Sequence, residues 1–224
     1  MVGVMTLYQS TIGKKVIMAV TGLMLIGFVF FHMYGNLKVF SGPEVFNAYA
    51  EGLRTVGYPI FGKLHLLTIA RIGLLGAFGL HIWSAIELSR QRQISRPIGY
   101  ADRKNLKSNY AALTIRWGGT VIALFVIYHL LHLTFGVVHP DFDGHNAYHN
   151  VVVGFQSWVV IIYFIALIAL GLHLYHATWS MFQTLGFNKQ SYETPLRLLG
   201  LGLATVVTGG FSLVPLAVLT GIVQ

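Results

Sequence analysis

Five long apolar segments constrain the fold of this chain more than any other feature of its sequence. They cover about residues 16–36, 60–86, 115–138, 151–182 and 196–222. Each reaches the roughly 20 residues that an α-helix needs to cross the hydrocarbon core of a bilayer. A membrane β-barrel would instead show alternating strands of about ten residues. Because a backbone in lipid must satisfy its own hydrogen bonds, we predict an all-α bundle of five transmembrane helices, in one domain over residues 1–224.

Composition narrows the chemistry that such a bundle can carry. Charged residues make up only 10% of the chain, far below the roughly 25% of a soluble domain. Cysteine is absent, which excludes disulfides, iron–sulfur ligation and thiolate metal sites. The net charge of +8 does not indicate nucleic-acid binding, because the basic residues flank apolar spans. The apolar run after Lys14 and Lys15 is too long for a signal peptide, so we expect it to remain as an anchor.

The placement of lysine and arginine predicts the orientation of the helices in the membrane. One side of the membrane receives Lys14, Lys15, Arg90, Arg92, Arg96, Arg103, Lys104, Lys107, Arg116, Lys189 and Arg197. The loops of the opposite side carry only Lys38, Arg54 and Lys63. We therefore expect a multi-pass protein of the cytoplasmic (inner) membrane, with a cytoplasmic amino terminus and an external carboxyl terminus.

Histidines occur in or near the ends of four of the five apolar spans. They are His32 in the first span, His65 and His81 in the second, His129 and His132 in the third, and His173 and His176 in the fourth. A histidine inside a membrane is costly and is by default a functional hypothesis. A single one could be a polar contact within the bundle. Four helices with the same feature make that interpretation weak.

The predicted topology arranges these histidines in two layers, at about 1.5 Å of depth per helical residue. His32 and His129 fall in the outer halves of helices that run outward. His81 and His173 fall in the inner halves of helices that run inward. Two imidazoles that approach from opposite faces are what a six-coordinate b-type haem requires. The layers therefore predict two haems enclosed by the bundle.

Two alternatives stay open at this point. Zinc and copper sites also use paired histidines, but they usually add a carboxylate or a thiolate, and the nearest acid, Glu87, lies at the inner rim. Residues three apart share one helix face, so spacing alone does not choose His129 over His132 or His173 over His176.

The stretches around the histidines carry a resemblance to a known family. They are Phe31-His32-Met33 followed by Asn36 and Phe40, Gly79-Leu80-His81-Ile82-Trp83, Leu124 to His129, and Gly171-Leu172-His173 through Trp179-Ser180. The chain resembles the diheme cytochrome b membrane-anchor subunit of succinate:quinone oxidoreductases, the succinate dehydrogenases and fumarate reductases, of the single-polypeptide five-helix type. The likeness extends over nearly the whole chain, in helix count, histidine order and the cytoplasmic basic loop.

This resemblance implies a ligand set and a role in respiration. It implies a distal haem b held by His32 and His129 and a proximal haem b held by His81 and His173, with iron as the ligated metal. It further implies that an iron–sulfur subunit, and through it a flavoprotein subunit, dock at the cytoplasmic face. Electrons from succinate would reach a quinone, usually menaquinone in this type, as in respiratory complex II of the tricarboxylic acid cycle. The chain would then be the quinone-reactive subunit, with no succinate-oxidising site of its own.

Two weaker candidates lie on the second span. His65 and Arg71 are polar enough to contact a quinone carbonyl or a haem propionate, although an interfacial histidine and a snorkelling arginine are equally good interpretations. Gly73, Gly76 and Gly79 recur at a spacing of three, which would let another helix or a flat cofactor approach closely.

The segment from His139 to His145, with His149 beyond it, contains metal-ligand residue types at a spacing that fits no known template. Its Pro, Asp and Gly residues favour a solvated turn.

Rival functions follow from the same pattern. A cytochrome anchor of a hydrogenase or a formate dehydrogenase, or an ascorbate-driven cytochrome, also places histidines on several helices. A transporter or a haem-free membrane anchor would place histidines without any need for two layers.

Overall fold

The computed structural model describes residues 9–95, 106–187 and 189–224, and within these ranges the chain is helical and has no strands. The long helices are α2 (Thr11–Leu37), α4 (His65–Ile94), α5 (Leu106–Leu133), α7 (Val159–Thr184) and α8 (Gln190–Leu219). All five are long and apolar enough to cross a membrane, with mean hydropathies from 1.3 to 2.2. The predicted all-α class with five membrane-spanning helices is confirmed. Arg96, Arg103 and Lys104 of the predicted basic loop lie outside the described residues.

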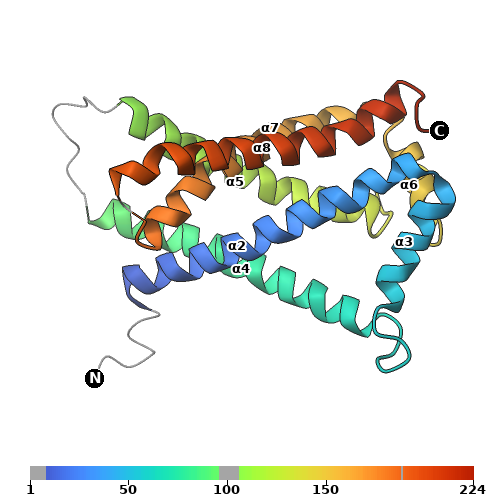
Figure 1. The fold of residues 1–224 in the computed structure, drawn as a ribbon, viewed down its shortest axis with the longest axis horizontal. Coiled ribbons are helices and arrows are strands. Elements are labelled where there is room, and N and C mark those ends of the chain that lie inside the picture. Colours follow the sequence, from blue (N-terminus) through green and yellow to red (C-terminus); the bar gives the residue numbers. More distant parts are fainter. Residues whose placement is uncertain (1–8, 96–105, 188) are drawn as a thin grey trace.

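Successive long helices run in alternating directions (Figure 1). The helices α2, α5 and α8 run toward the end of the bundle that carries the carboxyl terminus, and α4 and α7 run back. Two short helices, α3 (Pro43–Thr55) and α6 (Ala147–Gly154), lie at that same end. A 3-10 turn, η1 (Lys38–Ser41), connects α2 to α3. The arrangement matches the antiparallel order that the charge pattern predicts, and the sidedness itself stays a prediction.

Several predicted boundaries differ from the structure, and three of the differences have a local cause. The predicted span 151–182 is divided, because α6 ends at Gly154 and α7 begins only at Val159, after the polar pair Gln156 and Ser157. The predicted span 115–138 ends at Leu133, since the chain turns at Gly136 with a φ of 70°. The second span begins at His65 rather than near residue 60, because a turn occupies the segment before it.

The helices α3 and α6 form a cap over the outer end of the bundle. Phe46 of α3 is buried and packs edge-on against Tyr148 of α6, with ring centres 6.3 Å apart. The Asn47 side chain accepts a hydrogen bond from the backbone N–H of Tyr148 at 2.9 Å and donates one to Asn146 Oδ1 at 3.0 Å. These contacts close the bundle beside the ends of α2 and α5.

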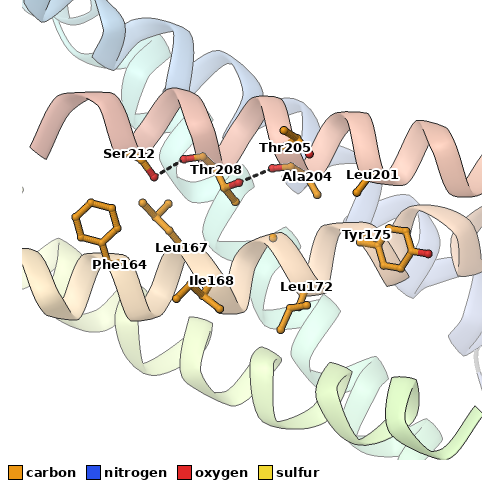
Figure 2. A pocket seen from close by; sticks show the side chains of 11 residues that line it. Phe164, Leu167, Ile168, Leu172, Tyr175, Leu201, Ala204, Thr205, Thr208 and Ser212 are labelled. Carbon is orange, nitrogen blue, oxygen red and sulfur yellow. Dashed lines mark hydrogen bonds between the residues drawn. The ribbon is translucent and has the colours of Figure 1, made fainter. Parts of the chain in front are cut away.

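The long helices pack in a defined order: α7 on α8, α2 on α4, and α5 on α7. The approach of α7 to α8 is closest at Gly200, where a Cβ atom would come within 2.8 Å of the Tyr175 carbonyl oxygen. A shallow groove of about 410 Å³ follows this helix pair (Figure 2). Two of its hydroxyls bond the backbone of α8, since Thr208 donates to Ala204 O and Ser212 to Thr208 O, each at 2.7 Å. The groove is therefore an apolar surface suited to lipid.

Candidate functional site

The outer histidine pair joins α2 to α5. The ring centres of His32 and His129 lie 5.9 Å apart, with the ring planes at 79°. Each residue sits within about a turn and a half of the outer end of its helix. Aromatic rings surround the pair, with Phe28 and Phe211 at 5.2 and 5.8 Å from His32 and Phe125 at 5.7 Å from His129. The pair is thus held in an apolar environment.

The inner histidine pair joins α4 to α7. The ring centres of His81 and His173 lie 6.3 Å apart, with the ring planes at 70°. Both residues fall just past the midpoints of helices that run inward in the predicted topology. The two layers predicted from charge and helix rise are therefore present as two pairs of facing rings. The structure brings together the partners that the sequence assigns to each other.

The spacing of the rings is what one shared metal atom requires. A metal–imidazole bond is about 2 Å long and each ring centre lies about 1 Å beyond its nitrogen, so ring centres on two faces of one metal stand about 6 Å apart. Both observed separations, 5.9 and 6.3 Å, agree with that value. Helices α2 and α5, like α4 and α7, are not among the closely packed helix pairs of the described chain. The histidines thus face one another across helices held apart, as a flat group between them would need.

A hydroxyl fixes the tautomer of His81. Thr21 of α2 donates its proton to the Ile17 carbonyl at 2.7 Å, so its oxygen accepts from His81 Nδ1 at 3.3 Å. The remaining nitrogen of His81, Nε2, then carries a lone pair. Metal-ligating histidines commonly have their second nitrogen held in this way. Thr21 therefore prepares His81 as a ligand.

Glycines lie beside both rings of the inner pair. A Cβ atom at Gly22 of α2 would meet His81 Cε1 at 3.3 Å, and one at Gly119 of α5 would meet His173 Cε1 at 3.8 Å. By contrast, a Cβ atom at Gly73, Gly76 or Gly79 would meet nothing within 4 Å. Close helix packing therefore does not explain the glycine series of α4, whereas Gly22 makes room for the ring of His81.

The two histidines that compete for the ligand roles are placed differently. His132 is fully buried, and its Nδ1 lies 2.9 Å from the Tyr163 hydroxyl. His176 contacts Tyr175 with ring centres 4.9 Å apart, and its ring stacks on no other histidine of the described chain. His132 stacks on His139 of the loop after α5, with ring centres 5.1 Å apart, and among the described residues neither His132 nor His176 is paired with a histidine of another long helix as His129 and His173 are. The geometry favours His129 and His173 as the ligands.

His65 and Arg71 do not join either histidine pair. His65 lies at the start of α4, where its Nδ1 accepts a hydrogen bond from the Gly62 N–H at 3.2 Å. Arg71 is exposed and makes no hydrogen bond or ion pair with any residue that the structure describes. His65 thus caps the turn before α4 and Arg71 is exposed, and their contacts with a quinone or a propionate stay a prediction.

The loop from His139 to His149 is an ordered turn. His139 donates from Nε2 to the Asn150 carbonyl at 2.8 Å, and His149 pairs with Asp141 at 3.0 Å. The Asn150 side chain also accepts a hydrogen bond from the Asp143 N–H at 2.8 Å and donates one to the Asp143 carbonyl at 2.7 Å. Across the described ranges, no group of three or more His, Asp or Glu side chains could hold a metal ion. The polar residues of this loop are engaged in holding the turn.

Sequence reasoning missed two residues that contact the histidines, Thr21 and Tyr163. Tyr163 of α7 is buried, with its hydroxyl 3.2 Å from His129 Nδ1. The available signal was a polar side chain within an apolar span. Which histidine each would reach depends on the packing of two helices, which the sequence pattern does not contain.

The comparisons with known proteins add no family to this geometry, because no family model, no curated protein and no solved structure matches the chain.

Proposed function

We propose that this chain is the diheme cytochrome b membrane subunit of a succinate:quinone oxidoreductase, which carries electrons from an iron–sulfur partner to a quinone. The observation that carries the proposal is the two pairs of facing histidines, His32 with His129 and His81 with His173, at ring separations of 5.9 and 6.3 Å. The pairs are supplied by four different helices in two layers. A structural anchor or a transporter has no need of this arrangement.

A haem suits these pairs better than a bare metal ion. Zinc prefers four protein or water ligands, often with a carboxylate or a thiolate, whereas each pair offers only two imidazoles. Haem iron receives its other four ligands from the porphyrin and needs two axial ligands from the protein. The apolar rings of Phe28, Phe125 and Phe211 around the outer pair suit the porphyrin face.

The residues of the chain would hold and orient the haems, which when bound supply the one-electron redox chemistry. His81 is oriented by Thr21, and the small residues Gly22 and Gly119 leave room beside the inner rings. The aromatic rings around the outer pair limit the access of water to its ligands. Protein contributions of this kind, which are ligation, hydrogen bonding and burial, set the reduction potential of a haem.

We assign the two ends of the bundle to different partners, a protein complex at one end and the quinone at the other. The inner end carries most of the basic residues, and we assign it to the iron–sulfur subunit, with the flavoprotein subunit beyond it. The quinone, menaquinone by the resemblance, would be reduced near the outer pair. The assignment to succinate rests on the sequence stretches around the histidines, since cytochrome anchors of hydrogenases or formate dehydrogenases would use the same ligand geometry.

Purification from the native membrane in mild detergent tests this proposal. We expect flavin and iron–sulfur subunits to copurify with the chain, and succinate to reduce the haem absorption bands. A chain that purifies alone and is reduced by ascorbate would instead support the ascorbate-driven cytochrome. Copurification with a hydrogenase or formate dehydrogenase would instead identify the chain as the cytochrome anchor of that enzyme.

A further inference from the structure

The hydroxyl of Tyr163 lies between two histidines of the same helix. It is 3.2 Å from His129 Nδ1 and 2.9 Å from His132 Nδ1, and all three side chains belong to the buried outer part of the bundle. Tyr163 is 7% exposed and His132 is fully buried, so water does not compete for these bonds. The three groups form a continuous hydrogen-bonded chain from α5 to α7 and back.

A hydroxyl has one proton, so it can donate to only one of the two rings and must accept from the other. The chain therefore has two possible directions. If the Tyr163 hydroxyl donates to His129, then His129 carries its own proton on Nε2 and cannot offer that nitrogen to iron. If it accepts from His129 Nδ1, the His129 Nε2 lone pair is free and Tyr163 donates to His132.

In the second direction, His132 is the last group of the hydrogen-bonded chain and accepts from Tyr163. Its Nδ1 would accept from Tyr163, which places its own proton on Nε2. That Nε2 is buried, has no hydrogen-bond partner among the described residues, and would lie 3.2 Å from a Cβ atom at Gly154. The His132 ring also stacks on His139 at 5.1 Å. Nε2 of His132 therefore lies beside Gly154 and the His139 ring, and the His132 ring is not paired with a histidine of another long helix among the described residues.

We infer that Tyr163 is a positioning residue for the outer haem: it accepts from His129 Nδ1, donates to His132, and so presents His129 Nε2 to the iron. This inference rests on the proposed function. It also gives His132 a role, as the terminal acceptor of the chain and not as a ligand. A ligand whose second N–H is hydrogen-bonded is more basic and stabilises the oxidised iron. The Tyr163 hydroxyl therefore lowers the reduction potential of the outer haem, and the inner haem is unaffected.

The test compares Tyr163→Phe with Tyr128→Phe in the purified complex. Tyr128 is a matched control, because its ring lies 5.6 Å from His132 and 6.4 Å from Tyr163 while its hydroxyl makes no hydrogen bond with any described residue. Haem content is measured first by pyridine haemochrome. The midpoint potentials and the low-spin ferric EPR signals of both haems are then measured by redox titration.

We expect Tyr163→Phe to retain both haems, to raise the potential of one of them, and to alter only that haem's EPR signal. A second variant, His132→Phe, should shift the same potential in the same direction by a smaller amount, because the Tyr163 hydroxyl loses its acceptor and polarises less. Tyr128→Phe should change neither potential.

The results that would overturn this inference differ from the result that would overturn the proposed function. A wild-type complex without haem would overturn the proposed function. A diheme wild type with unchanged potentials and EPR signals in Tyr163→Phe would overturn this inference and leave the proposed function standing. Loss of one haem in His132→Phe, with both haems retained in His129→Ala, would show that His132 is the ligand and would also overturn it.

Discussion

At the scale of single residues, the groups that contact and orient the paired histidines are hydroxyls and glycines rather than charged side chains. Thr21 holds Nδ1 of His81 and Tyr163 holds Nδ1 of His129, so that one member of each pair is oriented by a neutral group. A neutral partner suits a membrane interior, where an unpaired carboxylate would be expensive. Neutral hydroxyls can therefore hold the orientation of these histidine rings within the membrane without charged neighbours.

Replacement of Thr21 by valine should weaken the inner haem site. The side chain keeps its shape, but His81 Nδ1–H loses the Thr21 oxygen as an acceptor, so the ring is held less firmly. Loss of a contact of this kind typically costs 10- to 100-fold in metal affinity. Haem retention under dilution and the midpoint potential of the inner haem would measure the effect.

Thr178→Val is the matched control for this prediction. Thr178 is equally buried and also donates to the carbonyl of the preceding helical turn, at 2.7 Å from Leu174 O, but it contacts no histidine. Equal haem loss in both variants would contradict the role assigned to Thr21.

At the scale of the elements, a few specific contacts hold neighbouring helices against each other. Lys14 of α2 and Glu87 of α4 form an ion pair at 2.9 Å, with the Lys14 side chain nearly buried. At the same position Lys14 lies 5.8 Å from the centre of the Trp83 ring. Between α7 and α8, Gly200 permits the close approach of two backbones. These contacts hold the helices that supply the histidines.

Substitution of Lys14 by methionine should destabilise the α2–α4 pair more than the double substitution Lys14→Met with Glu87→Gln. The single variant leaves the Glu87 carboxylate without its closest partner, whereas the double variant removes both charges. Thermal unfolding in detergent, followed by circular dichroism, would give the order of stability. A single variant as stable as the double one would show that the ion pair contributes nothing.

Gly200→Ala should destabilise the bundle by about 1–3 kcal/mol, the usual cost of overpacking, because the added methyl meets the Tyr175 backbone carbonyl, which cannot move aside. Gly202→Ala, two residues further along α8, adds its methyl in open space and should be neutral or slightly stabilising. The midpoint of thermal unfolding checks both. A Gly200→Ala protein as stable as Gly202→Ala would contradict the close contact between α7 and α8.

At the scale of the whole molecule, five antiparallel helices carry two histidine pairs at different depths. The pairs lie on α2 and α5 toward the capped end, and on α4 and α7 nearer the middle of the helices. Carriers at two depths shorten the distance that an electron would cross between an inner partner and an outer quinone. In the proposed function, this arrangement would direct electrons across the membrane rather than along its surface.

The absence of native cysteine makes the predicted orientation directly testable. We expect His145→Cys, in the outer loop, to react in intact cells with a membrane-impermeant maleimide. Lys189→Cys, before α8, should react only after the membrane is opened. The reverse pattern would invert the topology and exchange the inner and outer layers.

The sequence predicts the parts of this molecule that depend on local periodicity and depth. The five spans and the two histidine layers follow from hydropathy, charge placement and helix rise, and the choice of His129 and His173 over His132 and His176 comes from the family resemblance. The cap helices α3 and α6 were not predicted, since both are short, and α3 has polar residues on one face. The contacts of Thr21 and Tyr163 depend on how neighbouring helices rotate against each other, which side-chain packing determines.

The most direct test of the central claim is a pyridine haemochrome measurement on the purified chain and its histidine variants. We expect two haems b per wild-type chain, and the loss of one haem in each of His32→Ala, His81→Ala, His129→Ala and His173→Ala. His132→Ala and His176→Ala should keep both haems. A wild-type chain without haem, or one that keeps both haems when His81 or His129 is replaced, would contradict the account.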